Sequence, residues 1–307
     1  MRKFSIVNFK NEIQPLNNEL PGSSGSTRES EVRIMLVNPS GLGFTMERNY
    51  NELGDGVHKS SKDSQQQGSF QCDLYFTGDN PYGDYQKFID WLLPSEKFMV
   101  AYSPYDGSVF RCEMQVEFIT KTELDRTGAL ICPCSFYCLT EWFKPTDYDF
   151  SIDPGIPENA ARFGLVRFDD DESSTPARFT SASNAAYSAI INPQGHSPAS
   201  LKFRFEGSVT NPTLSLVGRN TGTVYGECHV EVTINDGEIF EYSSDRSDSY
   251  IRRIVGNQTI NLEDLVTPGS LAYFLIPISE PCDLFFRGDS DPDGSMTGQV
   301  RHYYRSV

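Results

Sequence analysis

The stretch that decides the fold of this chain is PYGDYQKFIDWLLP, residues 81–94. Its apolar side chains recur at i, i+3, i+4 and i+7, the spacing of one face of an α-helix. Asn80 can cap the first turn, Pro81 suits the first helical position, and Pro94 prevents continuation beyond Leu93. The sequence therefore predicts one amphipathic helix here. Its apolar stripe consists of Tyr85, Phe88, Ile89 and Leu92.

The rest of the N-terminal half has the pattern of strands and turns. A lone amphipathic helix among strands can bury its stripe only against the apolar face of a sheet. Residues 110–118 and 130–142 alternate between apolar and polar side chains, which predicts strands with one buried and one solvated face. Shorter strands are expected at residues 4–9, 32–37, 69–76 and 98–103. The helix residues expected to lie off the apolar stripe are Asp84, Gln86, Lys87 and Asp90.

Three polar or proline-rich segments divide the chain. Residues 20–30 are rich in Gly and Ser, and residues 55–68 are polar throughout, so both are expected to be loops. Residues 144–158 contain three prolines and no periodicity, which favours a domain boundary near residue 150. A chain of 307 residues is long enough for two domains that each bury a core. We therefore expect domains at residues 1–150 and 151–307.

The C-terminal half reads as strand after strand at short spacing. The Asp236-Gly237 pair is a strong signal for a tight hairpin turn. A series of this kind is typical of an antiparallel sandwich or jelly roll. A short helical turn is expected at residues 261–265. The expected strands are residues 201–206, 228–234, 239–242, 250–255, 271–278, 282–287 and 300–304.

Composition excludes several classes of protein. The net charge is -16, with 42 acidic and 26 basic residues, which argues against a nucleic-acid-binding surface. The N-terminus has too short an apolar run for a signal peptide, and no segment approaches the about 18 apolar residues of a membrane helix. An odd count of seven cysteines argues against a secreted disulfide framework. We expect a chain made in a reducing cytosol, without membrane insertion.

Two clusters resemble metal sites. Cys132, Cys134 and Cys138 have the spacing Cys-x-Cys-x-x-x-Cys, which lacks the Cys-x-x-Cys pairs of zinc sites, so we expect them to pack in the core. The acidic residues at 289, 291 and 293 begin like a calcium-binding loop. Position 12 would be Val300, where the bidentate Glu should stand, so a hairpin turn is favoured. A calcium site completed by other loops stays an alternative, and its carboxylates would be Asp289, Asp291 and Asp293.

No catalytic motif stands out from the remaining residues. The acidic run at residues 169–172 is expected to be a solvated loop. The four histidines, His58, His196, His229 and His302, show no paired spacing. Neither a nucleophile elbow, a zinc-protease motif nor a phosphate-binding loop is present. We therefore predict no catalytic, cofactor-binding or metal-binding residue and no enzyme. A sugar surface would have to use the second-half tyrosines: Tyr187, Tyr225, Tyr242, Tyr250, Tyr273, Tyr303 and Tyr304.

The order of features over residues 30–145 resembles the distal tail (Dit-like) proteins of long-tailed, non-contractile bacteriophages. The features are the Gly41-Leu42-Gly43-Phe44 turn, a polar loop, the helix YQKFIDWLL and the hairpin FMVAYSPYDGSVFRCEMQVEFI. The closing segment is LICPCSFYCLTEWFKP. In the second half, NPQGHSPA at residues 192–199 and GSVTNP at residues 207–212 resemble the galectin-like second domain of those proteins.

This resemblance implies a mainly β chain: an antiparallel β domain with one packed helix, then a galectin-like β-sandwich. It implies a structural component of a tail tip or baseplate. The first domain would form a hexameric ring joining the tail tube to the host-recognition apparatus. Implied partners are the tail tube protein, a tail-associated lysin or fibre-base protein, and receptor-binding proteins. The implied location is the virion, after synthesis in the cytoplasm of the bacterial host. An acidic ring interior would repel passing DNA.

Two alternatives remain open from the residues alone. The first is a free-standing carbohydrate-binding β-sandwich protein whose first domain serves for oligomerisation. The second is a glycosidase that uses an acid pair among the 42 acidic residues. Glycan binding by the second domain, or hydrolysis of cell-wall polymers, would distinguish each from a structural virion protein.

Overall fold

A computed structural model describes residues 2–16, 34–43, 45–54, 57–66, 68–104, 107–153, 186–290 and 292–307. The chain divides into two compact units. Unit 1 comprises Met1–Pro145, Gly195–Ser197 and Tyr303–Val307, and unit 2 comprises Thr146–Gln194 and Pro198–His302. The chain thus crosses between the units four times. Strands β10 (Trp142–Tyr148), β13 (Ser197–Thr210) and β21 (Asp293–Tyr304) contribute to both. The boundary near residue 150 and independent folding stay predictions.

The predicted helix is present as α1 (Pro81–Leu92), the only α-helix among the described residues. Its N-cap is as expected, because the Asn80 side chain accepts a hydrogen bond from the backbone N of Gly83 at 3.1 Å. Phe88 and Leu92 are fully buried, and the ring of Phe88 lies 5.9 Å from that of Phe76. The expectation for Asp84 was wrong, since this side chain is buried at the helix start.

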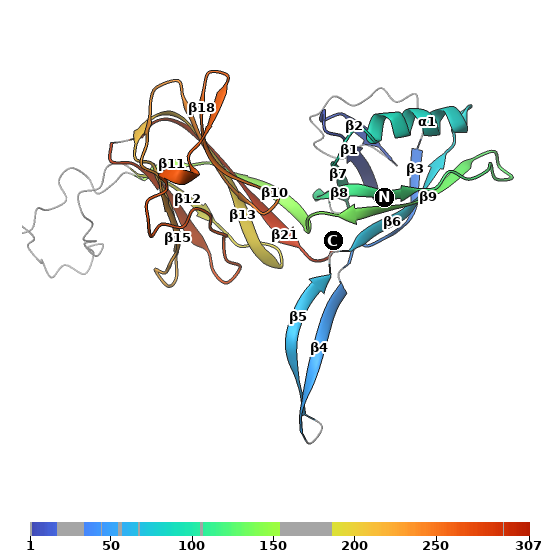
Figure 1. Cartoon of the computed structure of the whole chain (residues 1–307), viewed down its shortest axis with the longest axis horizontal. Helices are drawn as coiled ribbons and strands as arrows, with labels where there is room; N and C mark the ends of the chain where they lie inside the picture. The colour runs from blue at the N-terminus through green and yellow to red at the C-terminus, as the bar shows by residue number, and fades with distance from the viewer. Residues whose placement is uncertain are drawn as a thin grey trace, which may run out of the picture. The chain divides into compact units, whose positions relative to one another are not determined.

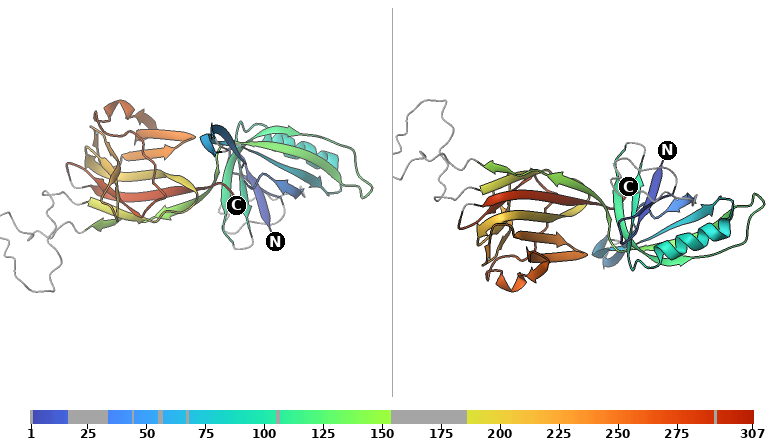
Figure 2. Two further views of the ribbon diagram at one scale, coloured as in Figure 1. Left: turned by 90° about the horizontal axis from the view of Figure 1, so that it is seen from below. Right: turned by 90° about the horizontal axis from the view of Figure 1, so that it is seen from above.

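Unit 1 is built on an antiparallel sheet whose strand order is β3-β6-β9-β8-β7-β1-β2. α1 lies on one face of this sheet (Figures 1 and 2). The first residues of β10 join it where Phe143 pairs with Arg111 of β8. The sheet strands are β1 (Lys3–Val7), β2 (Ile13–Pro15), β3 (Ile34–Ser40), β6 (Ser69–Phe76), β7 (Phe98–Ser103), β8 (Phe110–Ile119) and β9 (Leu130–Cys138).

The sheet face under α1 carries the alternating residues that the sequence predicts to be buried. On β9 these include Leu130, Cys132 and Phe136. Two details differ from expectation. β9 ends at Cys138, and Trp142 begins β10 instead. A β-bulge between Val116 and Phe118 shifts the register of β8, so Phe118 lies on the opposite, exposed face.

The polar segment at residues 55–68 is not a loop. β4 (Thr45–Gly54) and β5 (Val57–Gln66) pair as an antiparallel two-stranded ribbon. The ribbon extends away from the sheet of unit 1 (Figure 1). Strand alternation shows in a sequence only where one face is apolar and buried, and β5 has almost no apolar residue to reveal it. The segment at residues 20–30 lies outside the described residues, as do residues 169–172.

Unit 2 consists of two antiparallel sheets. One has the order β19-β18-β17-β13-β21-β10, and the other β11-β12-β20-β14-β15. The segment at residues 144–158, where the domain boundary is expected, therefore supplies most of β10 and all of β11. The further strands are β11 (Ser151–Asp153), β12 (Ala186–Ile191), β14 (Thr213–Gly218), β15 (Val224–His229), β16 (Thr233–Ile234), β17 (Ile239–Asp245), β18 (Asp248–Val255), β19 (Gln258–Asn261) and β20 (Cys282–Arg287).

The two sheets of unit 2 share one aromatic core. Phe286 of β20 lies 4.8 Å from the ring of Phe203 and 5.0 Å from that of Phe205, both on β13. Phe240 of β17 completes the group at 6.2 Å from Phe286. Rings from opposite sheets therefore interdigitate, which makes unit 2 a β-sandwich. The molecule as a whole is mainly β.

Two predicted strands of unit 2 were wrong in part. Residues 228–234 form two short strands, because the chain leaves β15 and pairs with β13 through β16. Residues 271–278 form no strand: the backbone N of Leu271 donates to Glu227 O at 2.8 Å, so this segment covers the edge of β15. The predicted helical turn is confirmed as η1 (Glu263–Leu265). None of the described helices is long and apolar enough to span a bilayer.

Candidate functional site

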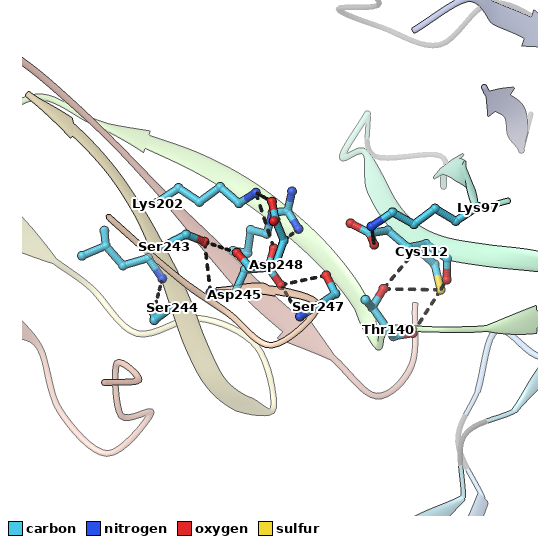
Figure 3. Close-up of polar contacts among 12 residues, drawn as sticks. Lys97, Cys112, Thr140, Lys202, Ser243, Ser244, Asp245, Ser247 and Asp248 are labelled. Atoms are coloured by element: carbon cyan, nitrogen blue, oxygen red, sulfur yellow. Dashed lines mark hydrogen bonds and ion pairs between the residues drawn. The ribbon is translucent and has the colours of Figure 1, made fainter. Parts of the chain in front are cut away.

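A dense polar cluster surrounds Asp245 in unit 2, at the end of β17 (Figure 3). Its carboxylate is fully buried and forms ion pairs with Arg301 and, at 3.8 Å, with Lys202. Oδ1 also accepts hydrogen bonds from the backbone N and the hydroxyl of Ser247 at 3.2 and 3.1 Å. Lys202 reaches Asp248 at 3.3 Å as well. Cations and turn donors thus hold this carboxylate in place, an arrangement that stabilises the β17–β18 turn.

A charged ladder crosses the same sheet of unit 2. Glu241 accepts from Arg204 at 2.9 Å and from Arg252 at 2.7 Å, so one carboxylate joins strands β13, β17 and β18. The guanidinium of Arg252 lies 3.9 Å from the ring of Tyr250. Glu238 accepts from Arg253, and this hydrogen bond lowers the pKa of Glu238 to about 2. Each of these acids is engaged with an arginine, as expected for a structural ladder.

Glu280 anchors a loop of the other sheet. Its oxygens accept from the hydroxyl of Tyr225 at 2.6 Å, the hydroxyl of Thr221 at 2.7 Å and the backbone N of Asn220 at 3.0 Å. The hydrogen bond from Tyr225, followed by that from Thr221, lowers the pKa of this carboxyl. The partners lie more than fifty positions away in the sequence, so no local pattern could have marked Glu280.

All seven cysteines are buried and free, which confirms the expected burial of Cys132, Cys134 and Cys138. Cys72 of β6 lies across from Cys134 of β9, with 3.2 Å between their Sγ atoms. In unit 1, the thiol of Cys112 donates to the backbone O of Thr140 at 3.1 Å, and Lys97 pairs with Glu113 at 3.6 Å (Figure 3). Within the described ranges, no three His, Cys, Asp or Glu side chains gather as metal ligands would.

The other residues singled out by the sequence are dispersed. Asp289 accepts from the Asn211 side chain at 2.6 Å, Asp293 begins β21, and Asp291 lies outside the described residues, so the calcium question stays a prediction. His196 contacts Tyr304, His229 lies 2.8 Å from the Thr213 hydroxyl, and His302 lies 3.3 Å from that of Tyr148. The side chain of His58 is not among those described.

The tyrosines considered for sugar binding have partners within the protein. Tyr242 is buried in the core, and its hydroxyl accepts from the backbone N of Phe274 at 3.0 Å. Tyr273 donates to Glu263, while Tyr225 and Tyr250 have the contacts given above. The rest pack against apolar neighbours: Tyr187, Tyr303 and Tyr304.

An apolar surface lies on the unit 1 sheet face opposite α1, and we call it the outer sheet face. Met35, Phe118 and Tyr137 are 47%, 49% and 39% exposed there. The register places Met35 beside Tyr75 and Tyr75 beside Ile131, both half-buried, so the exposed side chains continue across three strands. Among the described strands, β3 at this edge pairs only with β6. Phe118 and Tyr137 lie further along the sheet, beside polar residues of the same face. Exposed apolar side chains that gather on one face offer surface for protein–protein contacts.

Comparison with known proteins shows what this chain is similar to. The model of the family described as "Distal tail protein, N-terminal domain" matches residues 3–139. Two structures of the phage P2 baseplate in its activated conformation, with Ca and with Sr, contain a chain similar to this one. The likeness covers 100% of both chains at 13% identity, with TM-scores of 0.67 and 0.66.

A crystal structure of the SPP1 Dit (gp 19.1) protein is similar over 97% of this chain and 98% of that one. Its identity is 12% and its TM-score 0.54, so these likenesses concern the fold. None of the curated proteins matches the sequence. Residues 3–139 therefore belong to the family of distal tail protein N-terminal domains, and this match supports a structural role for the protein in a bacteriophage tail.

Proposed function

We propose that unit 1 assembles into a hexameric ring that joins the tail tube to the host-recognition apparatus. The observation that carries the proposal is the likeness of the whole chain to a baseplate chain, together with the family match of residues 3–139. The outer sheet face supports it, because a tail component needs apolar surface for its neighbours and Met35, Phe118 and Tyr137 offer it.

In the same proposal, unit 2 is a galectin-like attachment platform. Its sandwich core and charged ladder are complete within unit 2, so its surface is available to hold other components. The neighbours would be the tail tube protein on one side and a tail-associated lysin or fibre-base protein on the other. Receptor-binding proteins would attach at the periphery. The chain would be synthesised in the host cytoplasm and act at the tail tip.

We also infer that this chain catalyses no reaction. Support comes from the buried and clustered acids: Asp245, Glu241, Glu238 and Glu280 are each held by arginine, lysine, hydroxyl or backbone donors. A glycosidase acid must instead face a substrate-filled cleft with a second carboxyl group at a defined separation. No observation favours sugar binding, since each candidate tyrosine contacts other residues of its own unit.

Light scattering of the purified chain over a concentration series, combined with negative-stain images, tests the ring. We expect a species near six times the chain mass of 34.5 kDa, with sixfold symmetry. Purified tail tubes added to the monomer would reveal a ring that needs a tube end to form. A closed dimer or trimer, or a monomer that never binds tube ends, would contradict the proposal.

Charged substitutions identify the surface used. Phe118→Glu and Tyr137→Glu should reduce assembly, because each places a charge on the outer sheet face. The matched control is Ile260→Glu on β19 of unit 2, which is 43% exposed and should leave assembly unchanged. If the control and the test variants assemble alike, the outer sheet face is not a subunit contact.

A further inference from the structure

One pair of thiols in unit 1 is placed for a reaction that the tail role does not use. Cys72 and Cys134 are direct register partners on β6 and β9, and their Sγ atoms lie 3.2 Å apart. We propose that this pair is an oxidation site at which a peroxide forms a cross-strand disulfide between β6 and β9. The chemistry rests on this geometry, and only its biological setting rests on the proposed function.

Strand geometry selects this pair from among the cysteines of the sheet. Directly opposite residues of an antiparallel pair have Cα atoms about 4.5–5.5 Å apart, within the about 4.4–6.8 Å that a disulfide spans. Cys138 lies opposite Met114, so Cys112 is its diagonal neighbour. The thiols of Cys112 and Cys138 do interact, but the Cα separation of a diagonal pair, about 7–8 Å, exceeds the span of a disulfide. Cys132 lies opposite Leu74 and is likewise diagonal to Cys72.

The hydrogen bonds between β6 and β9 show which type of strand pair Cys72 and Cys134 form, and therefore their Cα separation. The backbone N of Cys138 donates to Gly68 O at 3.1 Å, so residues 68 and 138 form a hydrogen-bonded pair. Every second pair along the unbroken β6–β9 register repeats this arrangement, and residues 72 and 134 are one of them. Their Cα separation should be about 5.5 Å, near the commonest value for disulfides. Closure requires the sulfurs to approach by about 1 Å to the S–S bond length of about 2.05 Å.

The reaction is balanced with hydrogen peroxide as the oxidant. The Sγ of one cysteine, as thiolate, attacks a peroxide oxygen; the O–O bond breaks and hydroxide leaves, taking up the released proton as water. The resulting sulfenic acid is attacked by the other Sγ. The S–O bond breaks, a second water leaves, and the S–S bond forms. Two thiols and one peroxide thus give one disulfide and two waters.

Burial makes this site slow in the intact fold. Both side chains are almost fully buried, and the hydrogen bond with Cys134 together with burial raises the pKa of Cys72. A thiolate and an oxidant therefore meet there chiefly when the sheet opens locally. A chain made in a reducing cytosol would keep the pair reduced, and a virion outside the cell would meet an oxidising environment. The bond would join residues 62 positions apart on two neighbouring strands near the β3 edge of the sheet.

The test treats the full-length folded chain with hydrogen peroxide, removes the peroxide with catalase, unfolds the chain in denaturant, alkylates the free thiols and maps the peptides. We expect the alkylated thiols to fall from seven to five and one linked peptide to contain Cys72 and Cys134. The intact mass before alkylation should fall by two hydrogen atoms, and a reducing agent should restore seven thiols.

Two substitutions provide the matched comparison. Cys72→Ser should leave six alkylated thiols after peroxide and no linked peptide, whereas Cys228→Ser, at a buried cysteine of unit 2, should still lose two. Seven intact thiols in the treated wild-type chain, oxidation of Cys72 to sulfinic acid alone, or linkage through another cysteine would overturn the proposal. None of these results would affect ring assembly, so the two proposals fail separately.

Discussion

At the scale of single residues, buried carboxylates organise the turns and edges of unit 2. Asp245 and Glu280 each collect donors from segments far away in the sequence, so each one fixes two or three parts of the chain at once. Transferring a charge from water to the protein interior costs free energy, and a buried charge is stable only where ion pairs and hydrogen bonds offset that cost. Removing one partner then leaves a buried charge without compensation.

Asp245→Asn should destabilise unit 2 by about 3–5 kcal/mol, because Arg301 and Lys202 would keep their charges beside a neutral amide. Urea unfolding followed by far-ultraviolet circular dichroism measures this difference. The control is Asp248→Asn, three residues away and with a 54% exposed side chain, which should cost no more than about 1 kcal/mol. Equal effects of the two substitutions would mean that burial of Asp245 does not matter.

The pair of Glu238 and Arg253 predicts a dependence of stability on acidity. The hydrogen bond from Arg253 lowers the pKa of Glu238 from 4.5 to about 2, so the folded chain holds the ionised form more strongly than the unfolded chain does. The resulting stabilisation is fully present above pH 4.5 and is lost as the pH falls towards 2.

Glu238→Gln should therefore flatten the fall in melting temperature between about pH 5 and pH 2. Thermal unfolding at steps of pH measures the slope. Glu206→Gln is the control, since its ion pair with Arg204 is exposed on both sides and should change the slope little. A wild-type slope in the Glu238 variant would contradict the assignment.

At the scale of elements, the parts predictable from sequence are those specified by local signals. α1 combines a cap residue, a first-position proline and a 3.6-residue period, and β6, β7 and β20 have the predicted bounds. The polar ribbon of β4 and β5 lacks an apolar face, and the bulge before Phe118 adds a residue that no period reveals. Residues 271–278 are rich in apolar residues, as a strand would be, but they make only isolated backbone hydrogen bonds to β15 and β13.

Asn80→Ala should destabilise unit 1 by about 0.5–2 kcal/mol, because the backbone N of Gly83 loses its acceptor at the start of α1. Asn80→Asp should retain most of the stability, since a carboxylate caps equally well. Chemical unfolding followed by tryptophan fluorescence suits this measurement, because Trp91 and Trp142 both lie in unit 1. Gln86→Ala on the exposed face of α1 is the control, and a comparable loss there would argue against capping.

At the scale of the whole molecule, fold class was predictable from period and turn chemistry, whereas the polar clusters were not. Asp245 meets Arg301 across 56 positions, and such pairs depend on strand order rather than on any local pattern. The structural role was predicted from the order of features along the chain, because the sequence contains no recognisable catalytic motif. The segment at residues 144–158, chosen for the domain boundary because it lacks periodicity, carries strands of the sandwich.

Two fragments test that last point. Residues 146–302 contain β11 and the end of β10, while residues 158–302 lack them together with the 5.3 Å contact between Phe150 and Phe203. The loss of this aromatic packing alone should lower the melting temperature of the shorter fragment by about 10 °C. Circular dichroism melts of both fragments compare them directly. Equal melting temperatures would mean that residues 146–157 do not contribute to the stability of the sandwich.

The four chain crossings between the units have a mechanical and proteolytic consequence. They lie at residues 145/146, 194/195, 197/198 and 302/303. One nick by a protease in any single crossing would leave three covalent tethers, so neither unit could be shed by one cut. Likewise, a pull applied to unit 2 would be divided among several backbone segments. Two units joined by four backbone segments resist separation better than two units joined by a single linker.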